Sequence, residues 1–204
     1  MYAVFGKRIL DLFGTTILLF VALPILIIAA IQIFITMGRP IFFCQTRPGK
    51  NKIPFVIIKF RTMAALNKSE DSDEAQITYS GKVLRKFSID ELSQIINVLK
   101  GNMNLVGPRP LLTKYNDLFA EKHNKRFLVK PGITGWAQVN GRNQLCWDEK
   151  LKLDIYYVNH LSLFLDLKIL MKTIWFVLWS AGFKLGGEDE KFTGNNKELG
   201  VRKW

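Results

Sequence analysis

The chain has 204 residues, which suffices for one domain with an appendage and is short for two full domains. Its formal net charge is +12, yet 49% of its residues are hydrophobic, and this combination points toward a membrane surface. The two cysteines, Cys44 and Cys146, have no CxxC spacing and no histidine nearby, so neither a disulfide framework nor a zinc site is indicated. With only His123 and His160 available, a Ser-His-Asp or Cys-His mechanism also has little support.

The first expected element is an apolar helix over residues 12–35, a run of 24 residues without charge. At about 1.5 Å per residue this run can cross a hydrocarbon core of about 30 Å, so a transmembrane helix is the default interpretation. A cleaved signal peptide is not favoured, because its apolar region usually has about 7 to 15 residues and a small-residue cleavage site follows it.

Two features of this segment favour re-entry over a straight crossing. Pro24 lies at the middle of the run, where it removes a backbone donor and predicts a kink or a break. Basic residues flank both ends, Lys7 and Arg8 before the run and Arg39 after it, and such flanks prefer the cytoplasmic side. We therefore expect residues 1–38 to form a helix-break-helix anchor that enters one leaflet and returns.

A β-hairpin and a loop are expected after the anchor. The stretches PIFFCQ and KIPFVIIKF are extended in character and flank the turn-forming Arg47-Pro48-Gly49. Residues 67–81 are polar and acidic without an apolar period, which predicts a solvated loop.

The stretch FSIDELSQ places Asp90 and Glu91 where a helix is expected to begin, and the pair has two interpretations. Ser88 and Glu91 match the S-x-x-E capping box, in which each side chain bonds the backbone amide of the other residue. On that interpretation the carboxylates only stabilise the helix, which Gly101 would end as its C-terminal cap. The expected buried stripe of this helix is Leu92, Ile95, Ile96 and Leu99.

Basic residues around the pair favour chemistry instead. Helix N-termini bind phosphate, and a phosphate beside two carboxylates requires cations to neutralise it. The candidate cations are Arg85, Arg109 and either Lys59 or Arg61. One division of roles is that Glu91 holds Mg²⁺ while Asp90 attacks phosphorus and forms an acyl phosphate. The chain has neither a P-loop nor a G-x-G-x-x-G pattern, so ordinary ATPase and Rossmann functions are unsupported.

Further helices are expected over about residues 111–125, 147–159 and 163–183. The last of them has tryptophans and lysines beside an apolar stripe. The stripe consists of Leu167, Leu170, Met171, Ile174, Val177, Leu178 and Ala181. This pattern suits either a core helix or a helix lying flat among lipid headgroups, and both interpretations stay open.

Several motifs in fixed order resemble those of the bacterial sugar transferases called monotopic phosphoglycosyl transferases. They are KRILDLFG followed by LPI, IFFCQTRPG, KFRTM, LRKFSIDELSQIINVLKGNMNLVGPRPLL, PGITGWAQVNGRN and YYVNHLSLFLDLKIL. The resemblance covers residues 7–170 and looks closest to the small enzymes that begin bacterial protein N-glycosylation. In that family the anchor breaks at a Ser-Pro pair, and here the pair is Leu23-Pro24.

This resemblance implies transfer of a sugar-1-phosphate from a UDP-sugar to undecaprenyl phosphate, with release of UMP, through a covalent enzyme intermediate. It implies an N-acetylated amino sugar such as di-N-acetylbacillosamine. In the family the aspartate of the pair is the nucleophile and the glutamate binds Mg²⁺, roles that carry over to Asp90 and Glu91. By the same matching, phosphate contacts fall to Lys59, Arg85 and Arg109, and a nucleotide contact falls to Arg142.

The expected fold is α+β and mostly helical. It comprises the re-entrant membrane anchor at residues 1–38, a compact catalytic domain at residues 39–185 with a small β-hairpin and interfacial amphipathic helices, and a flexible tail at residues 186–204. The expected location is the cytoplasmic face of the bacterial inner membrane. Mg²⁺ is the expected cofactor, and the expected partners are the UDP-sugar, undecaprenyl phosphate, membrane lipid and other pathway enzymes.

The alternative function is a non-catalytic basic module that binds anionic lipid or nucleic acid. The net charge supports this alternative, but the cations are spread among turns and lack a recognition helix or an RNP motif. No nucleic-acid partner is therefore expected.

Overall fold

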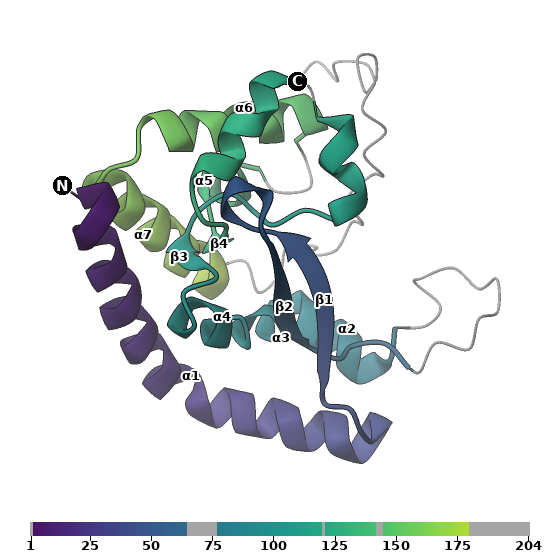
Figure 1. Cartoon of the computed structure of the whole chain (residues 1–204). Helices are drawn as coiled ribbons and strands as arrows, with labels where there is room; N and C mark the ends of the chain where they lie inside the picture. The colour runs from purple at the N-terminus through teal and green to yellow at the C-terminus, as the bar shows by residue number, and fades with distance from the viewer. Residues whose placement is uncertain (1, 65–76, 120, 142–144, 180–204) are drawn as a thin grey trace.

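The computed structural model describes residues 2–64, 77–119, 121–141 and 145–179, and it is an α+β structure with far more helix than strand (Figure 1). The α-helices are α1 (Lys7–Met37), α2 (Tyr79–Lys86), α3 (Ile89–Leu92), α4 (Ile95–Leu99), α5 (Trp136–Val139), α6 (Trp147–Asn159) and α7 (Leu163–Trp179). The strands are β1 (Phe42–Pro48), β2 (Pro54–Phe60), β3 (Asn104–Val106) and β4 (Gly132–Thr134). A π-helix covers Tyr2–Gly6, and 3-10 helices cover Lys50–Lys52 (η2), Thr113–Leu118 (η3) and Glu121–Leu128 (η4).

The helix α1 bends at its centre and does not break. Pro24 lies inside the continuous helix, and Figure 1 shows the helix axis changing direction about halfway along. The expected kink is therefore present, whereas the expected helix-break-helix form is not, because the turns on both sides of Pro24 remain helical. Within the described residues α1 is the one helix long and apolar enough to cross a membrane, judged by length and composition, with a mean hydropathy of 2.9.

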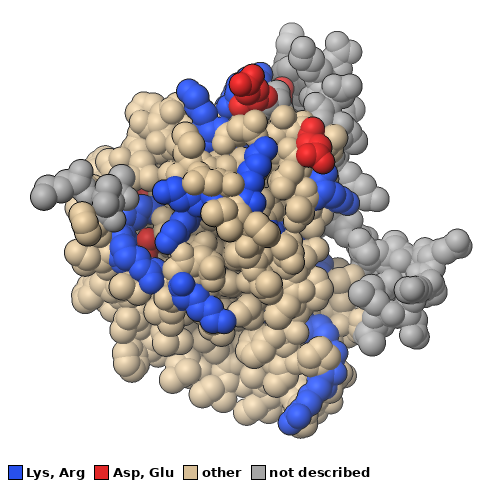
Figure 2. Space-filling model, viewed as in Figure 1, with Lys and Arg blue, Asp and Glu red and all other residues tan. Residues whose placement is uncertain are grey.

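Both ends of α1 are fixed to the same folded unit. Near the N-terminal end, Lys7 Nζ lies 2.8 Å from Asp166 Oδ2, and Asp11 Oδ1 accepts a 2.9 Å hydrogen bond from the Leu105 amide. At the C-terminal end, Arg61 donates to the carbonyls of the last helical residue and the two residues after it. The convex side is apolar and exposed, and Figure 2 shows uncharged surface along this arc with basic side chains near its two ends.

The predicted β-hairpin is confirmed, and its register matters for the site. β1 and β2 pair antiparallel, with Arg47 opposite Phe55 and Lys59 opposite Phe43. Directly opposed residues share a face and alternate residues along a strand return to it, so Arg47 and Lys59 lie on the same face. A second, two-stranded parallel sheet joins β3 to β4.

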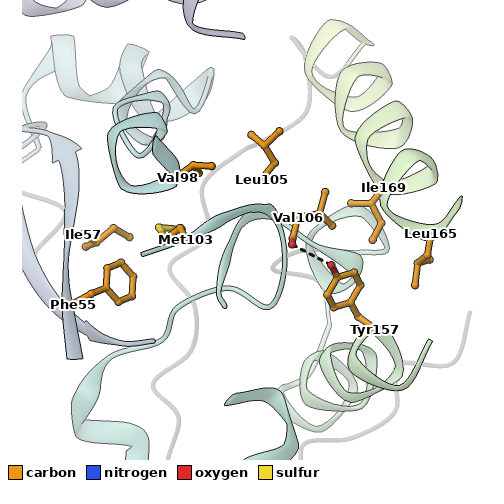
Figure 3. Close-up of a cluster of buried hydrophobic side chains, with 9 residues drawn as sticks. All are labelled: Phe55, Ile57, Val98, Met103, Leu105, Val106, Tyr157, Leu165 and Ile169. Carbon is orange, nitrogen blue, oxygen red and sulfur yellow. Dashed lines mark hydrogen bonds between the residues drawn. The ribbon is translucent and has the colours of Figure 1, made fainter. Parts of the chain in front are cut away.

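The main core lies between the hairpin, α4, β3, α6 and α7 (Figure 3). Its buried members are Phe55, Ile57, Val98, Met103, Leu105, Val106, Tyr157, Leu165 and Ile169. The Tyr157 hydroxyl donates to the Val106 carbonyl at 3.1 Å and to Asp166 Oδ1 at 2.7 Å. A second cluster packs η3 and η4 against α6 through Tyr115, Phe119, Phe127, Trp147 and Leu151.

The helices after the anchor match the predictions unevenly. The predicted helix 147–159 is confirmed as α6, whereas residues 111–125 form the two 3-10 segments η3 and η4 in place of one α-helix. The predicted helix over residues 89–100 is divided into α3 and α4. Gly101 ends α4 with a φ of 81°, and its amide bonds the Val98 carbonyl while the Asn102 amide bonds the Asn97 carbonyl.

The buried stripe predicted for α4 is wrong in part, and the apolar stripe of α7, for which a core and an interfacial interpretation were open, is largely exposed. In α4, Ile95 and Val98 are buried, whereas Ile96 and Leu99 are exposed. In α7, Leu165 and Ile169 are buried in the core, Leu170 of the predicted stripe packs against it, and several other members of the stripe face outward. The exposed members of that stripe are Leu167, Met171, Ile174 and Val177.

Part of the loop predicted at residues 67–81 is helical. Residues 79–81 begin α2, where the Thr78 hydroxyl accepts a 3.0 Å hydrogen bond from the Gly81 amide as an N-cap. Residues 67–76 lie outside the described residues, as does the predicted tail at 186–204.

Candidate active site

The Asp90-Glu91 pair lies in α3, a single turn whose geometry excludes the predicted capping box. Ser88 precedes α3 in the left-handed region, with a φ of 54°, and its side chain makes no capping hydrogen bond. The Glu91 carboxylate does not reach back to Ser88. Its Oε1 accepts from Lys59 Nζ at 2.7 Å and from Arg109 Nη2 at 2.7 Å, and its Oε2 accepts from Arg109 Nη1 at 3.1 Å. The capping interpretation is therefore wrong, because these two cations hold the glutamate.

Glu91 connects residues from three separate parts of the chain. Lys59 comes from β2, Glu91 from α3 and Arg109 from the loop after β3. Burial alone would raise the pKa of Glu91, but the charges and hydrogen bonds of Arg109 and Lys59 outweigh it and hold the pKa well below its usual range. Glu91 is thus a permanent anion that orients both cations, and two-point bonding by Arg109 is the strong form of such a contact.

Asp90 has a contrasting environment. Its side chain is partly buried, and no donor within the described residues forms a hydrogen bond to its carboxylate. Burial, followed by the charge of Glu91, raises the pKa of Asp90 to about 6, and the charges of Lys59, Arg85 and Arg109 oppose this rise. Two adjacent carboxylates whose pKa values are driven in opposite directions are typical of catalytic sites.

Arg85 lies on α2, which packs unusually close to the end of the hairpin. The Arg85 Nε donates to Thr62 Oγ1 at 3.0 Å, so its side chain is positioned by a residue just after β2. A Cβ added at Gly81 would lie 1.9 Å from the Thr62 carbonyl oxygen, so only glycine permits this approach.

A buried ion pair supports the loop that carries Arg109. Arg126 donates to Asp154 Oδ2 from Nε at 3.1 Å and from Nη2 at 2.7 Å. Its Nη2 also donates to the Arg109 carbonyl at 2.7 Å. Arg126 and Asp154 are 3% and 4% exposed, so the pair forms an internal support for the backbone of Arg109. Sequence reasoning missed both residues, because a contact across 28 residues leaves no local pattern.

A pocket opens beside these residues along the hairpin. It is lined by Arg47, Ile57, Lys59, Gln94, Arg109, Pro110, Leu111, Leu112, Tyr115 and Trp147. The sequence placed Arg47 in a turn and among the basic residues that follow the anchor, and assigned it no role in the site. The alternation along the hairpin could have placed it on the face of Lys59, had the register been known.

The structure thus brings Lys59, Asp90, Glu91 and Arg109 together, with Arg85 close enough to Asp90 to affect its charge. Arg61 was the alternative to Lys59 as a phosphate ligand. Its guanidinium donates instead to the backbone carbonyls at the end of α1, so the structure does not bring it to the site. Arg142 lies outside the described residues.

The carboxylates of this site can accommodate Mg²⁺ only with help from the substrate. Within the described residues no three His, Cys, Asp or Glu side chains form a metal cluster. Oε2 of Glu91 accepts a single hydrogen bond, and the neighbouring Asp90 carboxylate accepts none from the described residues. Proteins usually bind Mg²⁺ through one or two carboxylates plus phosphate oxygens and water, which is the donor set that this site offers.

Comparisons with known proteins find relatives that match most of the chain. The model of the bacterial sugar transferase family matches residues 2–180. The uncharacterized sugar transferase EpsL of Bacillus subtilis is 51% identical over 158 residues, which cover 75% of this chain and 78% of that protein.

Two further relatives have names that state a reaction. The UDP-N-acetylgalactosamine-undecaprenyl-phosphate N-acetylgalactosaminephosphotransferase of Aeromonas hydrophila is 42% identical over 69% of this chain and 36% of its own length. The UDP-glucose:undecaprenyl-phosphate glucose-1-phosphate transferase of Caulobacter vibrioides is 39% identical over 65% of this chain and 54% of its own length. This chain therefore spans a third to a half of these two longer proteins. Since the family model matches nearly the whole chain, the protein belongs to the bacterial sugar transferase family.

Proposed function

We propose that this chain transfers a sugar-1-phosphate from a UDP-sugar to undecaprenyl phosphate and releases UMP. Two observations carry the proposal together. The Asp90 carboxylate accepts no hydrogen bond from the described residues, and the adjacent Glu91 holds two cations beside it. The relatives named for transfer from UDP-sugars to undecaprenyl phosphate support the substrate classes.

The proposed reaction has two steps on the same phosphorus atom. In the first, an oxygen of Asp90 attacks the phosphorus that carries the sugar, and the bond from that phosphorus to the UMP phosphate breaks, so that UMP leaves with the electron pair. In the second, an oxygen of undecaprenyl phosphate attacks the aspartyl-phosphosugar and Asp90 is released as a carboxylate. A carboxylate nucleophile divides one difficult transfer into two easier ones.

The cations of the site have a separate task in this scheme. Lys59 and Arg109, held by Glu91, and Arg85, held by Thr62, would bind the phosphoryl oxygens and offset the repulsion between phosphate and Asp90. Because Glu91 and Thr62 fix these side chains before substrate binds, little reorganisation is needed during the reaction.

Mg²⁺ is proposed as the cofactor, held by Glu91, and when bound it would neutralise phosphoryl charge. We expect Glu91→Gln to lower the transfer rate and high Mg²⁺ to restore part of it, measured as UMP release over a Mg²⁺ titration. The matched control is Glu149→Gln, which changes an exposed glutamate of α6. If no Mg²⁺ concentration improves the rate of Glu91→Gln, metal binding by Glu91 is contradicted. The role of Glu91 would then be to position Lys59 and Arg109.

We further propose that the protein lies on the cytoplasmic face of the inner membrane with α1 re-entrant. The support is that both ends of α1 bond the same folded unit. Lys7 and Asp11 do so at the N-terminal end, and the backbone carbonyls bound by Arg61 do so at the C-terminal end. The outward apolar faces of α1 and α7 would contact lipid.

A labelling experiment separates re-entry from a straight crossing. One variant carries its only cysteine in an N-terminal extension, and the other retains only the exposed Cys44 after α1. Re-entry predicts that an impermeant maleimide added to spheroplasts labels neither, and that both react in inverted vesicles. Labelling of one cysteine from each side would show that α1 crosses the membrane.

The function is tested by supplying undecaprenyl phosphate with individual UDP-sugars and measuring UMP. We propose an N-acetylated amino sugar, with UDP-di-N-acetylbacillosamine as the leading candidate, and the name of the Aeromonas relative supports the N-acetylated class. The panel also includes UDP-N-acetylgalactosamine, UDP-N-acetylglucosamine, UDP-galactose and UDP-glucose. Release of UMP with none of them by a folded, membrane-inserted protein would argue against the proposed reaction.

A further inference from the structure

Arg47 lies in the same pocket as the site but at a distance from the carboxylate pair along the hairpin. It is opposite Phe55, while Lys59 is opposite Phe43, so the two basic residues are four positions apart on one face. At about 3.3 Å per residue their backbones are separated by about 13 Å along the strands. Both side chains nevertheless line one pocket, together with Arg109. The pocket therefore continues from Lys59 and Arg109, the two cations that Glu91 binds, toward the end of β1.

Within the described residues, the ion pairs of this pocket involve Lys59 and Arg109 but not Arg47. Lys59 and Arg109 share the carboxylate of Glu91. Arg47 forms no ion pair within the described part of the chain, and its partners are neutral. Its Nη2 donates to Gln45 Oε1 at 2.6 Å, and its Nη1 donates to the Pro110 carbonyl at 3.4 Å. These contacts aim the guanidinium, and the Glu91 charge that acts on it is already shared by Lys59 and Arg109.

A further donor of Arg47 is buried without an acceptor. Its Nε is shielded from solvent and bonds no acceptor within the described residues. Burial, followed by the charge of Arg109, lowers the pKa of Arg47 to about 10, so the cation is held in an unfavourable place. An oxyanion in the pocket would supply a negative charge that Arg47 need not share with Lys59 and Arg109.

We propose that Arg47 binds the phosphate of the nucleotide that leaves in the first step, an inference that rests on the proposed function. The phosphorus that reacts must lie at Asp90, beside Glu91, and the other phosphate of a UDP-sugar is the remaining anion of that substrate. The lining of the pocket also includes Tyr115 and Trp147, aromatic side chains of a kind suited to a nucleoside. Arg47 is thus a substrate-binding residue for the UMP half of the donor.

The first test is the binding of UMP to the full-length protein in detergent, measured by calorimetry without a lipid substrate. Arg47→Gln is expected to weaken UMP binding by about tenfold or more, because charge-assisted contacts to phosphate are lost. Arg47→Lys, which keeps the charge but not the planar fork, is expected to weaken it less. Lys50→Gln, at an exposed site in the same hairpin, is the matched control and should bind UMP as the wild type does.

Uridine separates phosphate binding from a general loss of structure. Its affinity should be the same for the wild type and for Arg47→Gln, whereas a role of Arg47 only in supporting Pro110 would lower the affinities for uridine and UMP together. An unchanged UMP affinity in folded Arg47→Gln would overturn the proposal.

A second test uses the wild type and so does not depend on the folding of a variant. Phenylglyoxal modification, followed by mass spectrometry, should be slowed at Arg47 by UMP and not at the exposed Arg39. Protection of Arg47 by undecaprenyl phosphate and not by UMP would assign the anion to the lipid and overturn the proposal. Neither test requires turnover, so a wild type that releases no UMP from any UDP-sugar would refute the proposed function while the role of Arg47 could still be determined.

Discussion

Replacing Asp90 by asparagine is expected to lower sugar-phosphate transfer by at least about a thousandfold, because the amide cannot form the acyl phosphate. The measurement is UMP release together with mass spectrometry of the trapped aspartyl-phosphosugar. Asp117→Asn, which changes an exposed acid of η3, is the matched control and should retain activity. Continued turnover by Asp90→Asn would show that Asp90 is not the nucleophile.

The same variant is expected to be more stable than the wild type at neutral pH. Burial raises the pKa of Asp90 to about 6 from its ordinary value of 3.8, so the folded protein holds this charge unfavourably once the pH exceeds 6. Removing the charge should raise the free energy of unfolding by about 1 to 3 kcal/mol, or the melting temperature by a few degrees.

The pH dependence identifies the cause of this gain. Below 3.8 Asp90 is protonated in both the folded and the unfolded states, so the advantage of asparagine should vanish. It should grow as the pH rises from about 4 to 6 and stay constant above that range. The stability difference between Asp90→Asn and the wild type is measured by thermal unfolding in detergent, with a chelator present to remove metal ions. An advantage that is equal at low and neutral pH would contradict burial of the charge as its cause.

Breaking the buried pair of Arg126 and Asp154 is expected to have the largest effect on stability. Asp154→Ala leaves the Arg126 guanidinium buried without its counterion, which should cost about 3 to 5 kcal/mol. Lys125→Met, at an exposed neighbouring site, is the control and should change stability little. A small loss in Asp154→Ala would mean that Arg126 finds another partner in the folded protein.

A double variant separates the stability of the pair from its support of Arg109. Arg126→Met with Asp154→Leu replaces the ion pair by apolar groups, which should restore most of the stability. It cannot donate to the Arg109 carbonyl, a bond of 2.7 Å in the native protein. Transfer should therefore stay about ten- to a hundredfold below the wild-type rate, as expected when a substrate-binding group is displaced. Full activity in the stable double variant would show that Arg126 is needed only for folding.

Local patterns predicted much of this protein because they need only nearby residues. Two extended stretches around the turn-forming Arg47-Pro48-Gly49 predicted the hairpin, the apolar run predicted α1, and Gly101 predicted the end of α4. The cations at Lys59 and Arg109 were predicted from the chemistry of two adjacent carboxylates and from the family motifs. The roles of these residues in the reaction remain predictions.

The remaining features depend on contacts that a local pattern does not contain. The capping box failed at Glu91, because two distant cations outcompete one local amide. Four members of the α7 stripe are exposed and Leu170 packs against the core, and the sequence left both environments open because a helical period identifies a face without its direction. The 3-10 segments η3 and η4 formed where an α-helix was expected, and the support of Arg109 by Arg126 joins elements far apart in sequence.

The register of the hairpin limits how this protein can change length over evolutionary time. Arg47 and Lys59 reach the pocket because both stand on the same side of the pleat. An insertion of one residue within either strand would shift the register, turn Arg47 or Lys59 outward and remove that cation from the proposed phosphate site without altering any side chain. Tolerated insertions should therefore fall in the turn at Lys50–Lys52, or come in pairs.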